Sequence, residues 1–141
     1  MAKVYSNEKT SENEGKHVYG GYVGGRMRRY RAVVKLDGQA SGDIIELVDI
    51  PAIETFAFGV LYTSVSLGTA TLSIGTADDA DEFMAAKTVT SADTPVFFGT
   101  SAAAGKDTAC ENGVRTVTAT VGTAALPASG TLVVDVYTSG V

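Results

Sequence analysis

The sequence predicts an all-β protein, an antiparallel β-sandwich of the jelly-roll or Greek-key type with one short helix and an extended N-terminal arm. Several runs of the chain alternate apolar and polar residues with a period of two, which is typical of strands with one face on a core. The runs are separated by turns rich in glycine, of which there are 16 among 141 residues. Because no helical periodicity lies between most of these runs, a sandwich of short strands is favoured.

The stretch from Gly42 to Gly75 contains most of the large apolar residues of the first two-thirds of the chain. Turn signals divide it into three candidate strands, at residues 43–50, 55–67 and 69–74. A strand that is apolar on both faces either lies in the middle of a fold or is broken by a bulge. The middle run is of this kind, with one face formed by Phe56, Phe58, Val60 and Tyr62 and the other by Leu61, Val65 and Leu67.

The sequence predicts two parts of the chain, an N-terminal arm over residues 1–25 and a folded body over residues 26–141. A chain of this length can bury a core as a single body. The arm is polar, lacks hydrophobic periodicity and is not a signal peptide, so we expect it to be extended and ordered only where it lies on a partner. The alternative is a frayed tail without a partner. The first strand of the body is expected over Arg26–Leu36, with a basic outer face.

A helix is predicted from Ala80 to Lys87, because Asp79 and Glu82 have the spacing of a helix N-cap and acids suit the positive end of the helix dipole. The acids of this segment also suggest a calcium site, but the spacing of a calcium-binding EF-hand loop is missing, so capping is the better explanation.

Three more strands are expected in the remainder of the body, over Thr94–Phe98, Arg115–Val121 and Thr131–Tyr137. The last two alternate valine, leucine and alanine with threonine. We expect them to pair with each other and to close the core. The total of seven to eight strands is consistent with a jelly roll or a related Greek-key sandwich.

Charge is divided unevenly along the chain. Residues 1–36 carry eight Lys and Arg against three Glu, whereas residues 37–141 carry three basic and thirteen acidic residues. An acidic body with a basic arm is poorly suited to nucleic acid and suits docking onto an acidic protein surface, including a neighbouring copy. The alternative is a solvated basic strand that protects an edge from aggregation. The candidate partner-binding residues are Tyr5, Tyr19, Tyr22, Arg26, Arg28, Arg29 and Arg31.

Catalytic and cofactor motifs are missing from the sequence. It contains no phosphate-binding loop, dinucleotide fingerprint or nucleophile elbow. The only cysteine, Cys110, and the only histidine, His17, lie far apart in the chain and suit neither a zinc site nor a nucleophile with its base. We therefore expect no enzyme activity, cofactor or metal. No run of roughly 18 apolar residues suggests a membrane span.

The body resembles small structural proteins of tailed bacteriophages. The likeness covers residues 42–138 and rests on the order GDIIEL…IPA…FGVLYTSVSLGTATLSIG, followed after a loop by TVTATVGTAALPASGTLVVDVYTS. It is a pattern of turns and apolar positions. The matching residues are Gly42, Asp43, Ile45, Pro51, Gly59, Leu61, Gly68, Thr71, Leu72, Gly75, Gly130, Val134 and Tyr137.

The resemblance implies a virion component made in the host cytoplasm, foremost a head decoration protein that binds the major capsid protein from outside and assembles as a homotrimer. The alternative is a receptor- or glycan-binding module on the head or tail. Exposed aromatic residues on one surface would favour a lectin, and a concave pocket with convergent titratable groups would favour an enzyme. A decoration protein would have neither, and would bury its arm and one body face against partners.

Overall fold

The computed structural model describes residues 2–17, 23–100 and 113–140, which form eight strands and one helix. The helix is α1 (Asn7–Asn13). The strands are β1 (Arg26–Lys35), β2 (Ile44–Ile50), β3 (Glu54–Thr63), β4 (Thr71–Gly75), β5 (Met84–Thr88), β6 (Val96–Phe98), β7 (Arg115–Gly122) and β8 (Thr131–Gly140).

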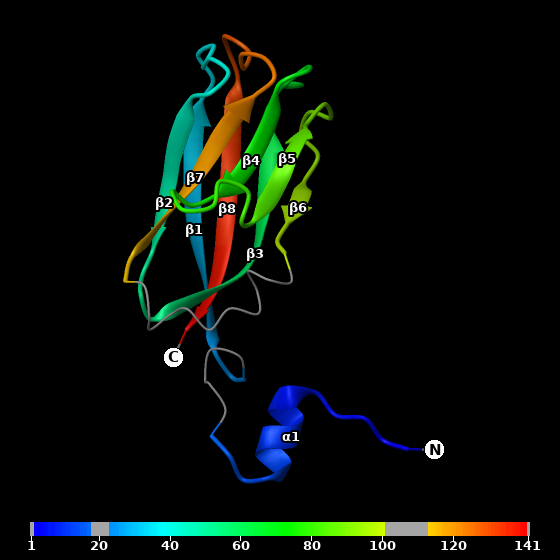
Figure 1. Cartoon of the computed structure of the whole chain (residues 1–141). Coiled ribbons are helices and arrows are strands. Elements are labelled where there is room, and N and C mark those ends of the chain that lie inside the picture. Colours follow the sequence, from blue (N-terminus) through cyan, green and yellow to red (C-terminus); the bar gives the residue numbers. More distant parts are fainter. Residues whose placement is uncertain (1, 18–22, 101–112, 141) are drawn as a thin grey trace.

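The strands form two antiparallel sheets that pack face to face (Figure 1). The first sheet has the order β1-β8-β3-β6 and the second has the order β2-β7-β4-β5. Successive strands alternate between the sheets except for β4 and β5, which are neighbours in the second sheet, and this is the order of an eight-stranded jelly roll built from two Greek keys. The predicted β-sandwich is confirmed, and β1 begins at Arg26, where the body was expected to start.

The prediction that the last two strands pair with each other is wrong. Strand β7 lies between β2 and β4 in the second sheet, whereas β8 lies between β1 and β3 in the first. The link between them therefore crosses from one sheet to the other instead of forming a hairpin. It is fixed by backbone hydrogen bonds from Leu126 to Gln39 and from Leu36 to Gly130, both 2.9 Å long, and by burial of the Leu126 side chain.

The core lies between the sheets and is formed by the inward side chains of both. Alternate residues of β8 and β7, namely Leu132, Val134, Val136, Val117 and Ala119, have no exposed surface. This alternation is the period of two that the sequence shows, so the inward faces of these two strands could be read directly from the sequence.

A bulge in β3 explains why this strand is apolar on both faces. Its register against β8 shifts between Phe56 and Phe58. Before the bulge Phe56 points into the core, where its ring stacks on that of Phe83 with the centroids 4.3 Å apart. After the bulge Leu61 points inward, whereas Phe58, Val60 and Tyr62 point to the outward side of the sheet. The extra residue of a bulge produces this change of face.

The helix predicted at Ala80–Lys87 is wrong. The segment is instead a turn followed by β5, which pairs with the edge of β4. The backbone N–H groups of Thr76 and Glu82 both donate to the carbonyl of Asp79, at 2.9 and 3.2 Å, so the acids order a turn and not a helix. Phe83 is also buried, and strand pairing with β4 outweighs the local helix signal.

The helix of the protein lies in the arm, where an extended segment was expected. The hydroxyl of Ser6 caps α1 by accepting from the backbone N–H of Lys9 at 3.1 Å, and Lys9 pairs with Glu12 at 3.2 Å. Seven residues are too few for a helix that is stable alone in water. Within the described ranges, no helix has the length and apolar character needed to cross a membrane.

Candidate interaction surfaces

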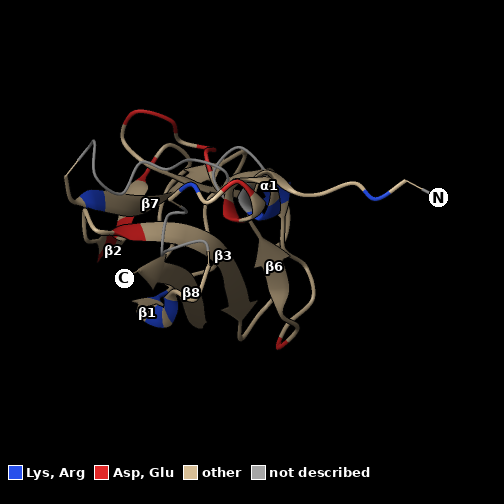
Figure 2. Ribbon diagram, turned by 90° about the horizontal axis from the view of Figure 1, so that it is seen from below, with Lys and Arg blue, Asp and Glu red and all other residues tan. Residues whose placement is uncertain are grey.

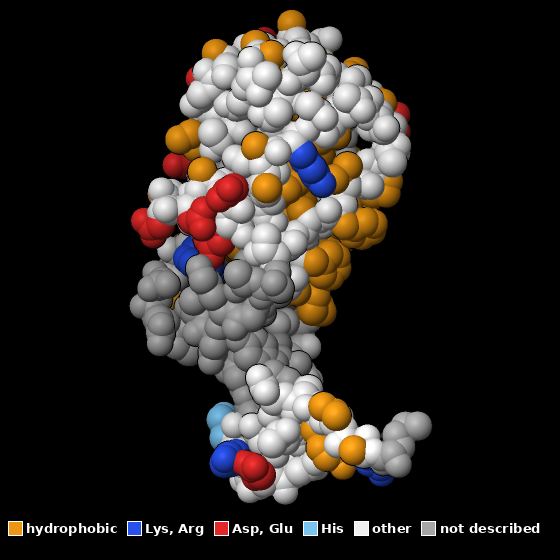
Figure 3. Space-filling model, turned by 45° about the vertical axis from the view of Figure 1, so that its right-hand side comes forward, with side chains coloured by type: hydrophobic (Ala, Val, Ile, Leu, Met, Phe, Trp, Pro, Cys, Tyr) orange, Lys and Arg blue, Asp and Glu red, His pale blue; other side chains and the backbone are white. Residues whose placement is uncertain are grey.

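The outward side of the first sheet carries a continuous set of apolar side chains. Cross-strand pairing places them in neighbouring rows, because residues paired in a sheet point to the same side. Phe97 is 68% exposed, Val33 66% and Phe58 39%. Figure 3 shows hydrophobic side chains gathered along the right-hand side of the body. We call this surface the aromatic face, and it comprises Val33, Phe58, Tyr62, Phe97, Val133 and Tyr137.

Two rings of the aromatic face lie against each other. Phe58 and Tyr137 are paired across β3 and β8, and their rings stack with centroids 4.7 Å apart and planes 10° apart. Each ring therefore covers one face of the other. The pair forms a ridge on the sheet, and one face of each ring is already occupied by the other ring.

An ion pair crosses the same side of the sheet. The guanidinium of Arg31 donates to both carboxylate oxygens of Asp135 at 2.7 Å, from Nε and Nη2. These hydrogen bonds hold the pKa of the Asp135 carboxyl below its ordinary value, against the opposing effect of its burial. The same contact raises the pKa of the Arg31 guanidinium. The pair joins β1 to β8, so Arg31 is committed to the body.

A second charged group lies inside the sandwich. Glu54 at the start of β3 is 3% exposed, and its Oε2 accepts from the hydroxyls of Tyr30 at 2.7 Å and Thr138 at 2.6 Å. Its Oε1 lies 3.2 Å from Nη1 of Arg28. Burial raises the pKa of the Tyr30 phenol above its ordinary value, and the hydrogen bond to Glu54 adds to the rise. Arg28 is therefore also used within the body.

The predicted partner-binding residues are thus divided among different environments. Tyr19 and Tyr22 lie outside the described residues, and Tyr5 is exposed in the arm. Arg26 and Arg29 are exposed on β1, and neither makes a direct ion pair with a described residue. The basic outer strand expected from the sequence is an edge strand of the first sheet (Figure 2). Its contact with a partner remains a prediction.

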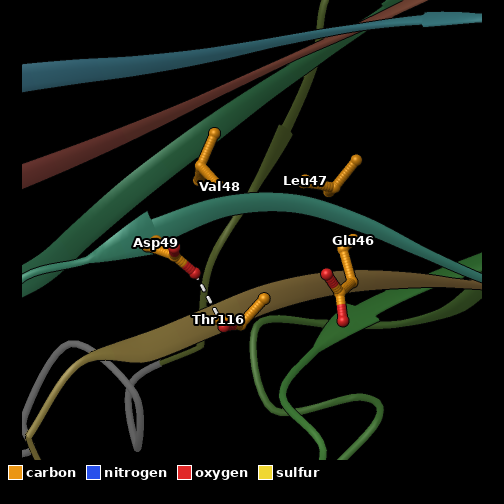
Figure 4. A pocket seen from close by; sticks show the side chains of 5 residues that line it. All are labelled: Glu46, Leu47, Val48, Asp49 and Thr116. Atoms are coloured by element: carbon orange, nitrogen blue, oxygen red, sulfur yellow. Dashed lines mark hydrogen bonds between the residues drawn. The ribbon is translucent and has the colours of Figure 1, made fainter.

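Two shallow hollows are open on the surface of the body. The first, of about 210 Å³, lies beside β2 and is lined by Glu46, Leu47, Val48, Asp49 and Thr116 (Figure 4). A register shift between Glu46 and Val48 puts the carboxylates of Glu46 and Asp49 on the same side of β2. The hydroxyl of Thr116 donates to Asp49 at 2.7 Å. No histidine, cysteine or lysine is among the described residues that line this hollow.

The second hollow, of about 340 Å³, lies between the edge strands β5 and β6. Phe83, Phe97 and Phe98 line it, and Lys87 is the only charged residue among its described lining residues. Among the described residues, no group of three or more acidic, histidine or cysteine side chains is placed to hold a metal ion. Cys110 lies outside the described residues, and His17 is exposed in the arm.

Comparison with solved structures identifies the fold. One chain of the structure described as the cyanophage Pam1 capsid asymmetric unit superposes with a TM-score of 0.67 and 21% identity, over 83% of this chain and 86% of that chain. A chain of the capsid of Ralstonia phage GP4 gives the same TM-score and coverage with 24% identity. The chain shares its fold with chains of phage capsids.

A third chain, from the acid-stable capsid of Helicobacter pylori bacteriophage KHP30, superposes with a TM-score of 0.50 and 16% identity, over 80% of this chain and 86% of that chain. Comparison with models of protein families gave no match. Comparison with curated protein sequences gave no match either. The likeness is therefore one of fold, and it includes most of each matched chain.

Sequence reasoning missed the aromatic face. The outward position of Tyr137 could be read from its alternation with Val134 and Val136, which are buried. The outward position of Phe58 could not, because the bulge shifts it relative to Phe56 and the sequence does not say where in the run the bulge lies.

Proposed function

We propose that the protein is a non-enzymatic structural component of a phage virion. In this proposal it is made in the host cytoplasm and binds the major capsid protein on the outer surface of the head, where it decorates and stabilises the shell. The observation that carries the proposal is the likeness of the whole body to chains of two phage capsids, each matched over 83% of this chain with a TM-score of 0.67.

The surface of the molecule supports a binding role over a catalytic one. The first sheet leaves apolar side chains exposed on its outward side. Exposed apolar patches of this kind often mark protein interfaces. The hollow beside β2 is shallow, and its described lining has two carboxylates and one hydroxyl but no histidine, cysteine or lysine. The expected assembly is a homotrimer, in which several weak contacts per copy add up across a capsid lattice.

A receptor- or glycan-binding module on the head or tail is the second candidate, and the exposed aromatic rings are the observation that favours it. Glycan sites use aromatic rings as stacking platforms. Here, however, the rings of Phe58 and Tyr137 stack on each other, and Phe97 lies on a short edge strand. This arrangement is better suited to burial against a protein surface.

The test is the abundance and position of the chain in purified virions. Quantitative mass spectrometry against the major capsid protein should find it in hundreds of copies, and antibodies should label the outside of intact heads. A few copies per particle would favour the receptor-binding candidate. Absence from the virion would contradict the proposal.

Disrupting the gene distinguishes decoration from shell formation. Heads without this chain should still assemble, but they should lose DNA at a lower temperature than wild-type heads. Adding the purified chain should restore their stability. Failure of any heads to form would contradict a decorating role.

A further inference from the structure

The two outer surfaces of the sandwich differ in chemistry. The aromatic face of the first sheet has apolar side chains at its centre and basic groups along β1, where Arg29 and Lys35 are exposed. Among the described strand residues that point to this side, the only acid is Asp135, which is neutralised by Arg31. The aromatic face is thus an apolar surface with an excess of positive charge.

The outward side of the second sheet is partly covered by the chain itself. The link between β4 and β5 folds over this sheet, because a Cβ added to Gly75 would overlap the backbone of Asp79 and Ala80. Glu82 fixes the link to the start of β7 through Arg115, with Oε1 and Nη1 3.6 Å apart. Ser73 and Thr118 on this side are buried, and the half-buried Thr71, Thr116 and Thr120 form the rest of its accessible surface.

The same side of the molecule carries exposed acids. A hydrogen bond to the Asp79 side chain, together with the negative charge of Asp79, raises the pKa of the Asp81 carboxyl, so these two groups lie close together in the link. Figure 3 shows acidic side chains away from the hydrophobic right-hand side of the body, and in Figure 2 acidic positions are coloured on β2 and on loops above it, on the side opposite β1 and β8. We call this surface the acidic side, and it comprises Glu46, Asp49, Asp78, Asp79 and Asp81.

We propose that copies of this chain associate front to back, with the aromatic face of one copy on the acidic side of the next. The basic groups beside the aromatic face then meet exposed carboxylates, and the small threonine side chains allow close approach of the aromatic ridge. This inference builds on the proposed self-association and names its surfaces. A front-to-back contact uses two different surfaces, so it closes into a ring when the rotation between copies permits. A three-membered ring gives the proposed trimer.

Two variants of the full chain test the contact. The front variant, Arg29→Glu with Phe97→Ser, changes only the aromatic face and its basic rim. The back variant, Asp78→Lys with Asp81→Lys, changes only the acidic side. Sedimentation velocity over a range of concentrations should show an oligomer for the wild type. It should show association weakened about tenfold or more for each variant, as expected when central contacts are removed.

Mixing the two variants gives the decisive result. The front variant keeps an intact acidic side and the back variant keeps an intact aromatic face, so an equimolar mixture should associate under conditions in which neither variant associates alone. A mixture that remains monomeric overturns the proposal. An unchanged oligomer for the back variant also overturns it, because aromatic faces would then meet each other.

Controls separate association from folding and from capsid binding. A matched variant with Val114→Ser and Asp37→Lys changes exposed residues outside both surfaces and should keep the wild-type mass. Circular dichroism and urea unfolding should show that each variant is folded, and Arg29→Glu alone replaces the front variant if Phe97→Ser unfolds it. A wild-type chain that is monomeric yet binds capsids overturns this inference and leaves the proposed function standing. If the chain forms the expected oligomer in solution but is missing from virions, the proposed function is contradicted and this inference stands.

Discussion

The carboxylate of Glu54 is the most constrained charged group of the body at the scale of single residues. Two hydroxyls donate to it, from Tyr30 at 2.7 Å and Thr138 at 2.6 Å, and Arg28 lies 3.2 Å away. A buried charge is tolerated when it is paired and hydrogen-bonded, and removing one partner leaves the others unsatisfied. The cluster joins β1, β3 and β8 at one end of the first sheet.

Replacing Glu54 should therefore lower the free energy of unfolding more than replacing an exposed glutamate does. We expect Glu54→Ala to lower the free energy of unfolding by about 2–4 kcal/mol, because the buried partners lose their acceptor. Glu54→Gln should cost less, since its amide oxygen can still accept one hydroxyl. Urea denaturation measures both, and exposed Glu46→Ala is the control, with an expected change within about 0.5 kcal/mol. Equal stability of the Glu54→Ala variant and wild type would contradict this account.

The ion pair between Arg31 and Asp135 should make stability depend on pH. The pKa of Asp135 is lowered in the folded protein, so its ionised form stabilises the fold above the unfolded pKa of about 3.9. This contribution is lost as the pH falls through the lower, folded pKa. Asp135→Asn should be less stable than the wild type at pH 7, and the difference should shrink at pH 3. Urea midpoints at the two pH values test this, and an equal difference at both would show that the charge is not responsible.

At the scale of elements, the bulge in β3 determines which side chains reach the core and which reach the surface. Phe56 and Phe58 are two residues apart and would share a face in a regular strand. With the register shift between them, Phe56 is 1% exposed and Phe58 is 39% exposed. The aromatic face exists because of this bulge.

Alanine substitutions in β3 measure the effect of the bulge. Phe56→Ala should cost about 3–5 kcal/mol of stability, because it leaves a cavity beside Phe83. Phe58→Ala should cost clearly less, since it removes contacts mainly with the ring of Tyr137. Thermal and urea unfolding of the two variants provide the comparison. Similar losses for both would indicate a regular strand with Phe58 in the core.

The elements show what a single sequence can and cannot predict here. Alternation fixed the positions of β7 and β8 because each has one apolar face, but it could not show that they lie in different sheets. Pairing depends on the path of the linking segment, whose anchor is the buried Leu126. The helix predicted at Ala80–Lys87 is wrong for a local reason, because acidic residues that cap a helix also stabilise turns.

At the scale of the whole molecule, charge and apolar surface are distributed unevenly. The basic residues of the first 36 positions are concentrated in the arm and on β1, while exposed acids lie on the second sheet and its covering loop. The division of charge along the chain is visible in the sequence itself. The sequence does not show which of these charges are available to a partner, because Arg28 and Arg31 form ion pairs within the body while Arg29 is exposed.

Deleting residues 2–25 tests the role of the arm. Its described side chains are almost all exposed, including Val4 at 94%, so the truncated body should unfold at the same temperature as the full chain. Ordering an arm costs on the order of 1 kcal/mol per residue, so a bound arm must make many contacts. We therefore expect truncation to weaken attachment to capsids or association between copies, measured as capsid occupancy and sedimentation mass.

Salt and a point variant separate the contribution of charged groups to attachment from the contribution of apolar area in the arm. Raising the salt concentration should weaken attachment of the full chain if exposed groups such as Arg26 pair with carboxylates, since such pairs are screened. Tyr5→Ser keeps the length and charge of the arm but removes apolar area, so it should weaken attachment less than the deletion does. Equal capsid occupancy and unchanged mass for full-length and truncated chains would show that the arm is a tail without a partner. In that case the exposed surfaces of the body alone would have to account for binding.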